Sequence, residues 1–122
     1  MPETIIRFPR PFQLWTFAVS YRSLLFRSTK SASEKSRIDV YCQNVQLINV
    51  PTVMQSLAIS LESAESKETL CRQLGLNVPK QHKLYQINYG TSLGQVLANN
   101  IVWHEDTLEY YDPSFFSADF PS

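Results

Sequence analysis

Glycine is scarce in this 122-residue chain, which contains only Gly75, Gly90 and Gly94. A phosphate-binding loop or a dinucleotide-binding fingerprint needs clustered glycines, because the backbone must turn tightly and approach the phosphates closely. The spacing of these three glycines makes neither motif. We therefore expect no nucleotide-dependent chemistry and no bound cofactor.

Cysteine is equally scarce and occurs only as Cys42 and Cys71. The two residues are far apart in the sequence and form no Cys-x-x-Cys pair, so neither a structural zinc site nor a thioredoxin-type centre is predicted. We expect both to be reduced, partly buried thiols that are not bonded to each other, because the sequence shows no export signal. Mass spectrometry of the non-reduced protein tests this expectation.

Histidine occurs only as His82 and His104. A metal site would have to recruit carboxylates or a thiol from distant parts of the chain, and we predict no metal site. The dipeptide at 104–105 begins like the zinc-protease motif, but Leu108 stands where the second histidine of that motif is required. A cysteine paired with one of the histidines as a nucleophile is left open, because such partners meet only in the folded protein. No catalytic motif is found.

Long apolar runs are missing as well. The longest, residues 24–26 and 101–103, are much shorter than the roughly 20 residues that a membrane helix requires. The N-terminal sequence MPETIIRFPRPF has neither the basic start nor the apolar middle of a signal peptide. These absences favour a cytoplasmic location.

The net charge is zero, but the charges are distributed unevenly along the chain. Residues 1–37 contain seven basic and two acidic residues, and residues 38–122 contain four basic and nine acidic residues. One interpretation is that basic and acidic strands lie side by side in a sheet and pair across it. The other is a polar surface that orients a partner.

Nucleic acid is considered because arginines and aromatic residues alternate in the N-terminal third, as in platforms that bind single strands. The basic residues are too few and too scattered for a patch, and the pI of about 6.7 is near neutral. We therefore do not expect a nucleic-acid partner.

The most strongly patterned stretch is FQLWTFAVSYRSLLFRS, residues 12–28, which predicts a β-hairpin with arms at 12–19 and 23–28. Its aromatic and β-branched residues favour strand over helix. Both faces of the first arm are mostly apolar, as in a strand that is covered on two sides. Trp15 is therefore predicted to lie in the core, and so is Leu57 in a later strand.

One short helix is predicted over residues 67–74, with Ser66 as its N-cap, Gly75 at its C-terminal end, and Leu70 and Leu74 docked on the sheet. Residues 92–99 are ambiguous, because a capping-box spacing there also fits a short helix. The remaining strands are predicted over residues 4–8, 37–43, 45–50, 53–62, 83–89, 95–104 and 107–111.

Many strands and little helix predict one mainly β (α+β) domain over residues 1–122. The preferred architecture is a single antiparallel, strongly curved sheet or small barrel with one short helix packed on it. A two-sheet β-sandwich is the alternative.

Two functions are compatible with the sequence. The first is a small non-catalytic interaction module that is capable of self-association. The second is a ligand-binding or enzymatic small β-barrel, whose pocket would be lined by tyrosines and by His82 or His104. A deep polar pocket that contains either histidine would favour the second function, and a shallow surface with an apolar patch would favour the first.

The C-terminal phenylalanines suggest where such a module would bind. They follow a turn at 112–114, and leaving them in water would expose an apolar area large enough to mark an interaction site. They either fold back on their own domain or meet a second copy in a homodimer, with acidic residues of one copy against arginines of the other. The predicted interaction surface comprises Arg7, Arg10, Arg27, Glu105, Asp106, Glu109, Asp112, Phe115, Phe116 and Phe120.

Overall fold

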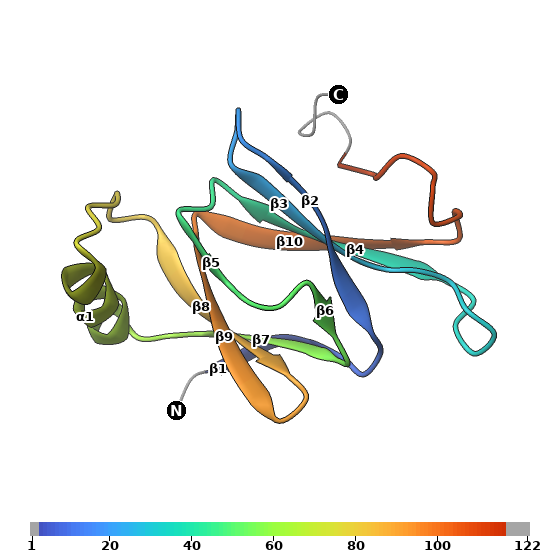
Figure 1. The fold of residues 1–122 in the computed structure, drawn as a ribbon, viewed down its shortest axis with the longest axis horizontal. Helices are drawn as coiled ribbons and strands as arrows, with labels where there is room; N and C mark the ends of the chain where they lie inside the picture. The colour runs from blue at the N-terminus through green and yellow to red at the C-terminus, as the bar shows by residue number, and fades with distance from the viewer. Residues whose placement is uncertain (1–2, 117–122) are drawn as a thin grey trace.

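The computed structural model describes residues 3–116, which form ten strands and one helix (Figure 1). In chain order, the elements are β1 (Glu3–Phe8), β2 (Phe12–Ala18), β3 (Ser23–Ser28), β4 (Arg37–Gln43), β5 (Leu47–Asn49), β6 (Val53–Met54), β7 (Leu57–Leu61), α1 (Ala64–Leu74), β8 (Lys83–Tyr89), β9 (Ser92–Ala98) and β10 (Asn100–Asp106).

The strands form two antiparallel sheets of five strands each, in the orders β1-β7-β8-β9-β5 and β10-β4-β3-β2-β6. The core lies between the sheets, since its buried side chains come from both of them, for example Ile59 and Ile87 from one sheet and Phe26 and Val40 from the other. The mainly β prediction is confirmed. The sheets do not close into a barrel, so the preferred single-sheet architecture is not confirmed, and the two-sheet sandwich fits instead.

Two segments of the chain, β4 to β5 and β9 to β10, run side by side, and each passes from one sheet to the other. β4 pairs with β10 and β5 pairs with β9, while β9 is joined to β10 through the single residue Asn99. Asn44, between β4 and β5, has a φ of 52°, a left-handed conformation that asparagine tolerates better than most residues. The predicted strand over 95–104 is therefore two strands that belong to different sheets.

The predicted strand over 53–62 is divided in the same way. β6 pairs with β2 in one sheet, and β7 pairs with β1 and β8 in the other. Met54 and Leu57 both lie in the core, so the apolar pattern continues through the place where the chain changes sheets.

The two core predictions have different outcomes. Leu57 is fully buried, as predicted, but 37% of Trp15 is exposed. The register of β2 with β3 shifts between Leu14 and Thr16, so Trp15 is the extra residue of a bulge. The prediction for Trp15 is wrong, because an apolar strand pattern does not distinguish a core position from the lining of a cleft.

The helix begins earlier than predicted. Its N-cap is Ser63, whose side chain accepts a hydrogen bond from the backbone N–H of Ser66, and it ends at Gly75, whose φ of 67° is left-handed. None of its residues is fully buried. Leu70 is half-buried but Leu74 is exposed, so only one of the two predicted docking residues contacts the domain closely.

Both cysteines are free thiols, one buried and one half-buried. Burial raises the pKa of the Cys42 thiol far above its usual value, so this thiol stays protonated. Across residues 3–116, no helix has the length and apolar content needed to cross a bilayer.

Candidate functional site

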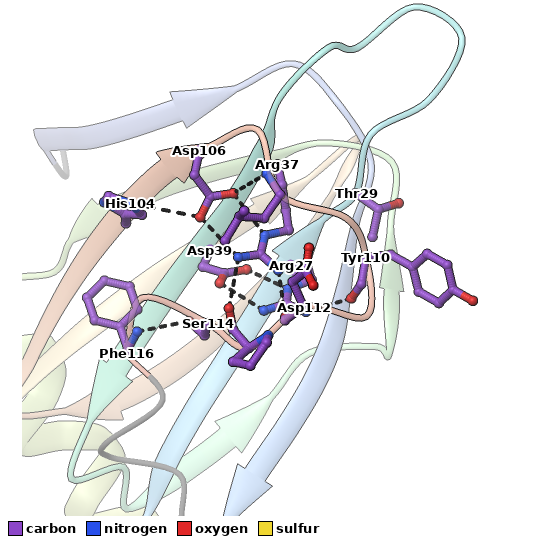
Figure 2. Close-up of polar contacts among 12 residues, drawn as sticks. Arg27, Thr29, Arg37, Asp39, His104, Asp106, Tyr110, Asp112, Ser114 and Phe116 are labelled. Carbon is purple, nitrogen blue, oxygen red and sulfur yellow. Dashed lines mark hydrogen bonds and ion pairs between the residues drawn. The ribbon is translucent and has the colours of Figure 1, made fainter.

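Charged side chains gather on the outer face of the β10-β4-β3-β2-β6 sheet, opposite the core. Arg27 of β3 pairs in register with Asp39 of β4, and Arg37 of β4 pairs in register with Asp106 of β10. Their neighbours in sequence, such as Phe26, point into the core because strand side chains alternate between faces. Figure 2 shows these four charged residues side by side, beneath the chain that follows β10.

Two bidentate ion pairs form the centre of this cluster. The Arg27 Nε and Nη2 atoms donate to the two Asp39 carboxylate oxygens at 2.7 and 3.0 Å, and only 2% and 1% of the two side chains are exposed. The Arg37 Nε and Nη2 atoms donate to Asp106 at 3.1 and 3.0 Å. The interpretation that oppositely charged strands pair across one sheet therefore holds for these residues.

The remaining guanidinium donors hold the C-terminal strap, which we define as residues 107–116. Arg27 Nη1 donates to the backbone oxygens of Tyr110 and Asp112 at 2.7 and 3.3 Å. Arg37 donates from Nη1 to the backbone oxygens of Glu109 and Asp112 at 2.9 and 2.7 Å, and from Nη2 to that of Pro113 at 3.1 Å. A buried charge needs such partners, because desolvation otherwise makes it costly.

These contacts also explain why the predicted strand over 107–111 is wrong. Carbonyl oxygens of the strap accept hydrogen bonds from arginine side chains, and the strap contains no strand. The strap thus crosses the outer face as an irregular segment, as Figure 1 shows for the chain beyond β10.

Aromatic contacts hold the end of the strap. The Phe115 ring stacks on His104 with centroids 4.0 Å apart, and the Phe116 ring lies 5.2 Å from that of Tyr41. Phe115 nevertheless remains largely exposed, and Phe116 is half-buried. These two phenylalanines fold back on their own domain, whereas Phe120 lies outside the described residues.

The other predicted surface residues lie in several places. Arg10 is buried, and it donates to Ser28 Oγ and to the Ser36 backbone oxygen at 2.7 and 2.6 Å. Arg27 is buried as described above, so the structure removes both arginines from the predicted surface. Arg7 is exposed on β1, in the other sheet.

The acidic members of the predicted surface have partners within the chain. Glu105 accepts a hydrogen bond from Ser36 Oγ, and Glu109 pairs with Lys30 at 2.9 Å. Asp112 accepts a hydrogen bond from the backbone N–H of Glu109.

The environment of Asp106 lowers the pKa of its carboxyl group. Desolvation is the largest influence and by itself raises the pKa, but hydrogen bonds from Arg37 and from the Leu108 N–H, together with electrostatic interactions with Arg37 and His104, lower it below its ordinary value. The ionised carboxylate is therefore favoured in the folded protein.

A pH dependence follows from this lowered pKa. The ionised carboxylate stabilises the folded state at pH values above the unfolded pKa of about 4, and this contribution is lost as the pH falls through the folded pKa. Chemical denaturation of the wild type and of Asp106→Asn should show a constant difference in unfolding free energy above about pH 5, which narrows below about pH 4. A difference that is independent of pH would contradict the shift.

The strap and the β2-β3 hairpin enclose an open cleft of about 510 Å³. We call it the aromatic cleft, and its lining residues are Trp15, Thr16, Leu25, Arg27, Tyr110, Tyr111, Asp112, Pro113 and Ser114.

Three of the nine residues that line the aromatic cleft are aromatic: Trp15, Tyr110 and Tyr111. Tyr110 and Tyr111 are both exposed and meet edge to face, with centroids 5.1 Å apart. The Trp15 ring lies 4.9 Å from the guanidinium carbon of Arg27, a cation-π distance. Because Arg27 is buried and bonded to Asp39 and to the strap, its guanidinium is not a free charge in the aromatic cleft, and the half-buried Asp112 is the acidic residue of the lining.

The histidines lie elsewhere. His82 is buried, with its Nε2 atom 2.9 Å from the Asn44 backbone oxygen, and neither His82 nor His104 lines the aromatic cleft. Within the described part of the chain, no group of three or more histidine, cysteine, aspartate or glutamate side chains is placed to hold a metal ion.

The comparisons give no relative from which a role could be transferred. No family model matches the sequence, and no curated protein or solved structure matches it. The function of this chain is therefore inferred from its own geometry.

Proposed function

We propose that this protein is a non-catalytic interaction module that binds an extended segment of a partner protein in the aromatic cleft. The observation that supports the proposal is the exposure of three large rings, those of Trp15, Tyr110 and Tyr111, around one cleft. Aromatic-lined grooves bind extended, proline-containing segments. Such a segment is already extended before it binds, and tyrosine and tryptophan side chains have few rotatable bonds, so little conformational entropy is lost on binding.

The support beneath the aromatic cleft agrees with a binding role. The backbone of the strap is fastened by Arg27 and Arg37, whereas Figure 2 shows the Tyr110 ring directed away from the ion pairs. A rigid support lowers the entropy that is lost on binding. The alternative of an enzymatic or ligand-binding pocket built around a histidine has less support, since the aromatic cleft contains neither histidine.

Selection from a random peptide library displayed on phage tests the proposal. Peptides that contain proline or aromatic residues should be enriched on the wild type, and their Kd should rise about ten-fold or more for Trp15→Ala and Tyr111→Ala, because central aromatic residues dominate binding energy. Tyr111 is well exposed, so its removal should not disturb folding.

Leu93→Ala is the matched control. Leu93 is an exposed apolar residue of β9 in the other sheet, and it lies outside the aromatic cleft. It should leave the Kd of the selected peptides unchanged. The absence of enriched peptides, or peptides that bind Trp15→Ala and Tyr111→Ala as tightly as the wild type, would refute the proposal.

A further inference from the structure

The edges of the two sheets are protected to different degrees. An edge strand presents unpaired N–H and C=O groups that can pair with another chain, and proteins usually limit this by short strands, bulges, prolines or lysines. The outermost strands are β1 and β5 in one sheet and β10 and β6 in the other. β5 and β6 have only three and two residues, so neither offers a useful ladder.

The longer edges differ from each other. The register of β1 shifts between Thr4 and Ile6, and Pro9 follows directly after the strand. The part of β2 that extends beyond β6 contains the bulge at Trp15. β10 has seven residues, pairs with β4 in an unbroken register, and contains neither proline nor lysine. Among the described residues, β10 is therefore the long regular edge, and its charged side chains Glu105 and Asp106 stand only at its C-terminal end.

A large apolar side chain lies in the middle of this edge strand. Trp103 is the fourth of the seven residues of β10, and 46% of its surface is exposed. Its ring meets the half-buried Phe8 edge to face, with centroids 6.4 Å apart. A ring beside an open strand edge supplies the apolar contact that backbone pairing alone lacks.

We propose that two copies of this chain associate through the free edge of β10, in an antiparallel two-fold pairing centred on Trp103. This register places Trp103 opposite the partner's Trp103, Ile101 opposite the partner's Glu105, and Asn100 opposite the partner's Asp106. Each acidic residue thus faces a neutral one. A parallel pairing would bring the acidic ends of both strands together, which is unfavourable.

Charge complementarity supports a second copy as the occupant. Lys83 Nζ donates to the Asn99 backbone oxygen at 3.2 Å, so a positive charge lies at the N-terminal end of β10. The proposed register brings this lysine beside the acidic end of the partner's β10, and the two-fold axis repeats the contact. The strands that line the aromatic cleft are β2 and β3, which β4 separates from β10 in the sheet, and the proposed pairing uses no residue of the cleft, so this inference does not depend on the proposed function.

Sedimentation equilibrium with a charge-reversal series tests the pairing. The wild-type chain should dimerise over a range of about 1 to 500 μM, as expected for a modest interface. Lys83→Glu and Glu105→Lys should each weaken the dimer about ten-fold, because each change converts two attractive contacts into repulsive ones. The double variant should recover the dimer, since attraction is restored with reversed signs.

Glu68→Lys provides the matched control, since Glu68 is an exposed acid on the helix and lies away from β10. It should leave the dimer unchanged. Lys83 and Glu105 are themselves exposed, so folding should survive both reversals, and circular dichroism checks this. A wild type that stays monomeric, a dimer that neither reversal weakens, or a double variant as weak as the single ones would overturn the proposal.

Discussion

Replacing Arg27 with alanine should lower the free energy of unfolding by about 3 to 5 kcal/mol, because it leaves a buried carboxylate without its partner. Asp39 has almost no exposed surface, and both of its carboxylate oxygens accept hydrogen bonds from Arg27. The substitution also removes the donor that holds the backbone oxygens of Tyr110 and Asp112. Chemical denaturation at neutral pH measures the loss.

Lys30→Ala is the matched control for this prediction. Lys30 pairs with Glu109 at 2.9 Å, but both side chains are partly exposed to solvent. An exposed pair of this kind contributes about 0 to 1 kcal/mol. If Arg27→Ala destabilises the protein no more than Lys30→Ala does, the buried pair does not hold the strap on the sheet.

Replacing Leu57 with alanine should lower the free energy of unfolding by about 2 to 5 kcal/mol, through the lost burial of apolar surface and the cavity that remains. Leu57 is 0% exposed and belongs to the cluster between the two sheets. Leu93→Ala, at a position that is 60% exposed, should change stability by less than about 0.5 kcal/mol. Equal losses for the two variants would show that Leu57 does not pack as described.

Strand periodicity was sufficient to predict the regular strands of this fold. β3 and β8 begin and end at the predicted residues, and the two arms of the hairpin pair as expected. The pattern failed where the chain moves from one sheet to the other, within residues 53–62 and 95–104. The alternation of apolar and polar residues along a strand depends on which side chains are buried. Because both sheets bury their side chains in the same core, the alternation changes little where the chain moves from one sheet to the other.

The candidate site was predicted only in fragments. Arg27, Asp106, Asp112, Phe115 and Phe116 were selected from the sequence, and the structure brings them together within one chain. Their partners were missed, because finding them requires the register of strands that are distant in sequence. One signal was available: Arg27 and Asp39 are charged residues beside apolar neighbours within predicted strands, Arg27 after Phe26 and Asp39 between Ile38 and Val40.

Residues 110 and 111 of the strap are held through their backbone neighbourhood rather than through their side chains, whereas Phe115 and Phe116 hold the end of the strap by their rings. Arg27 and Arg37 bind backbone oxygens at positions 109, 110, 112 and 113, and every amino acid provides such an oxygen. Side chains at 110 and 111 can therefore be exchanged while the loop keeps its course. The domain is accordingly a scaffold on which the chemistry of one surface can diversify without rebuilding the interior that supports it.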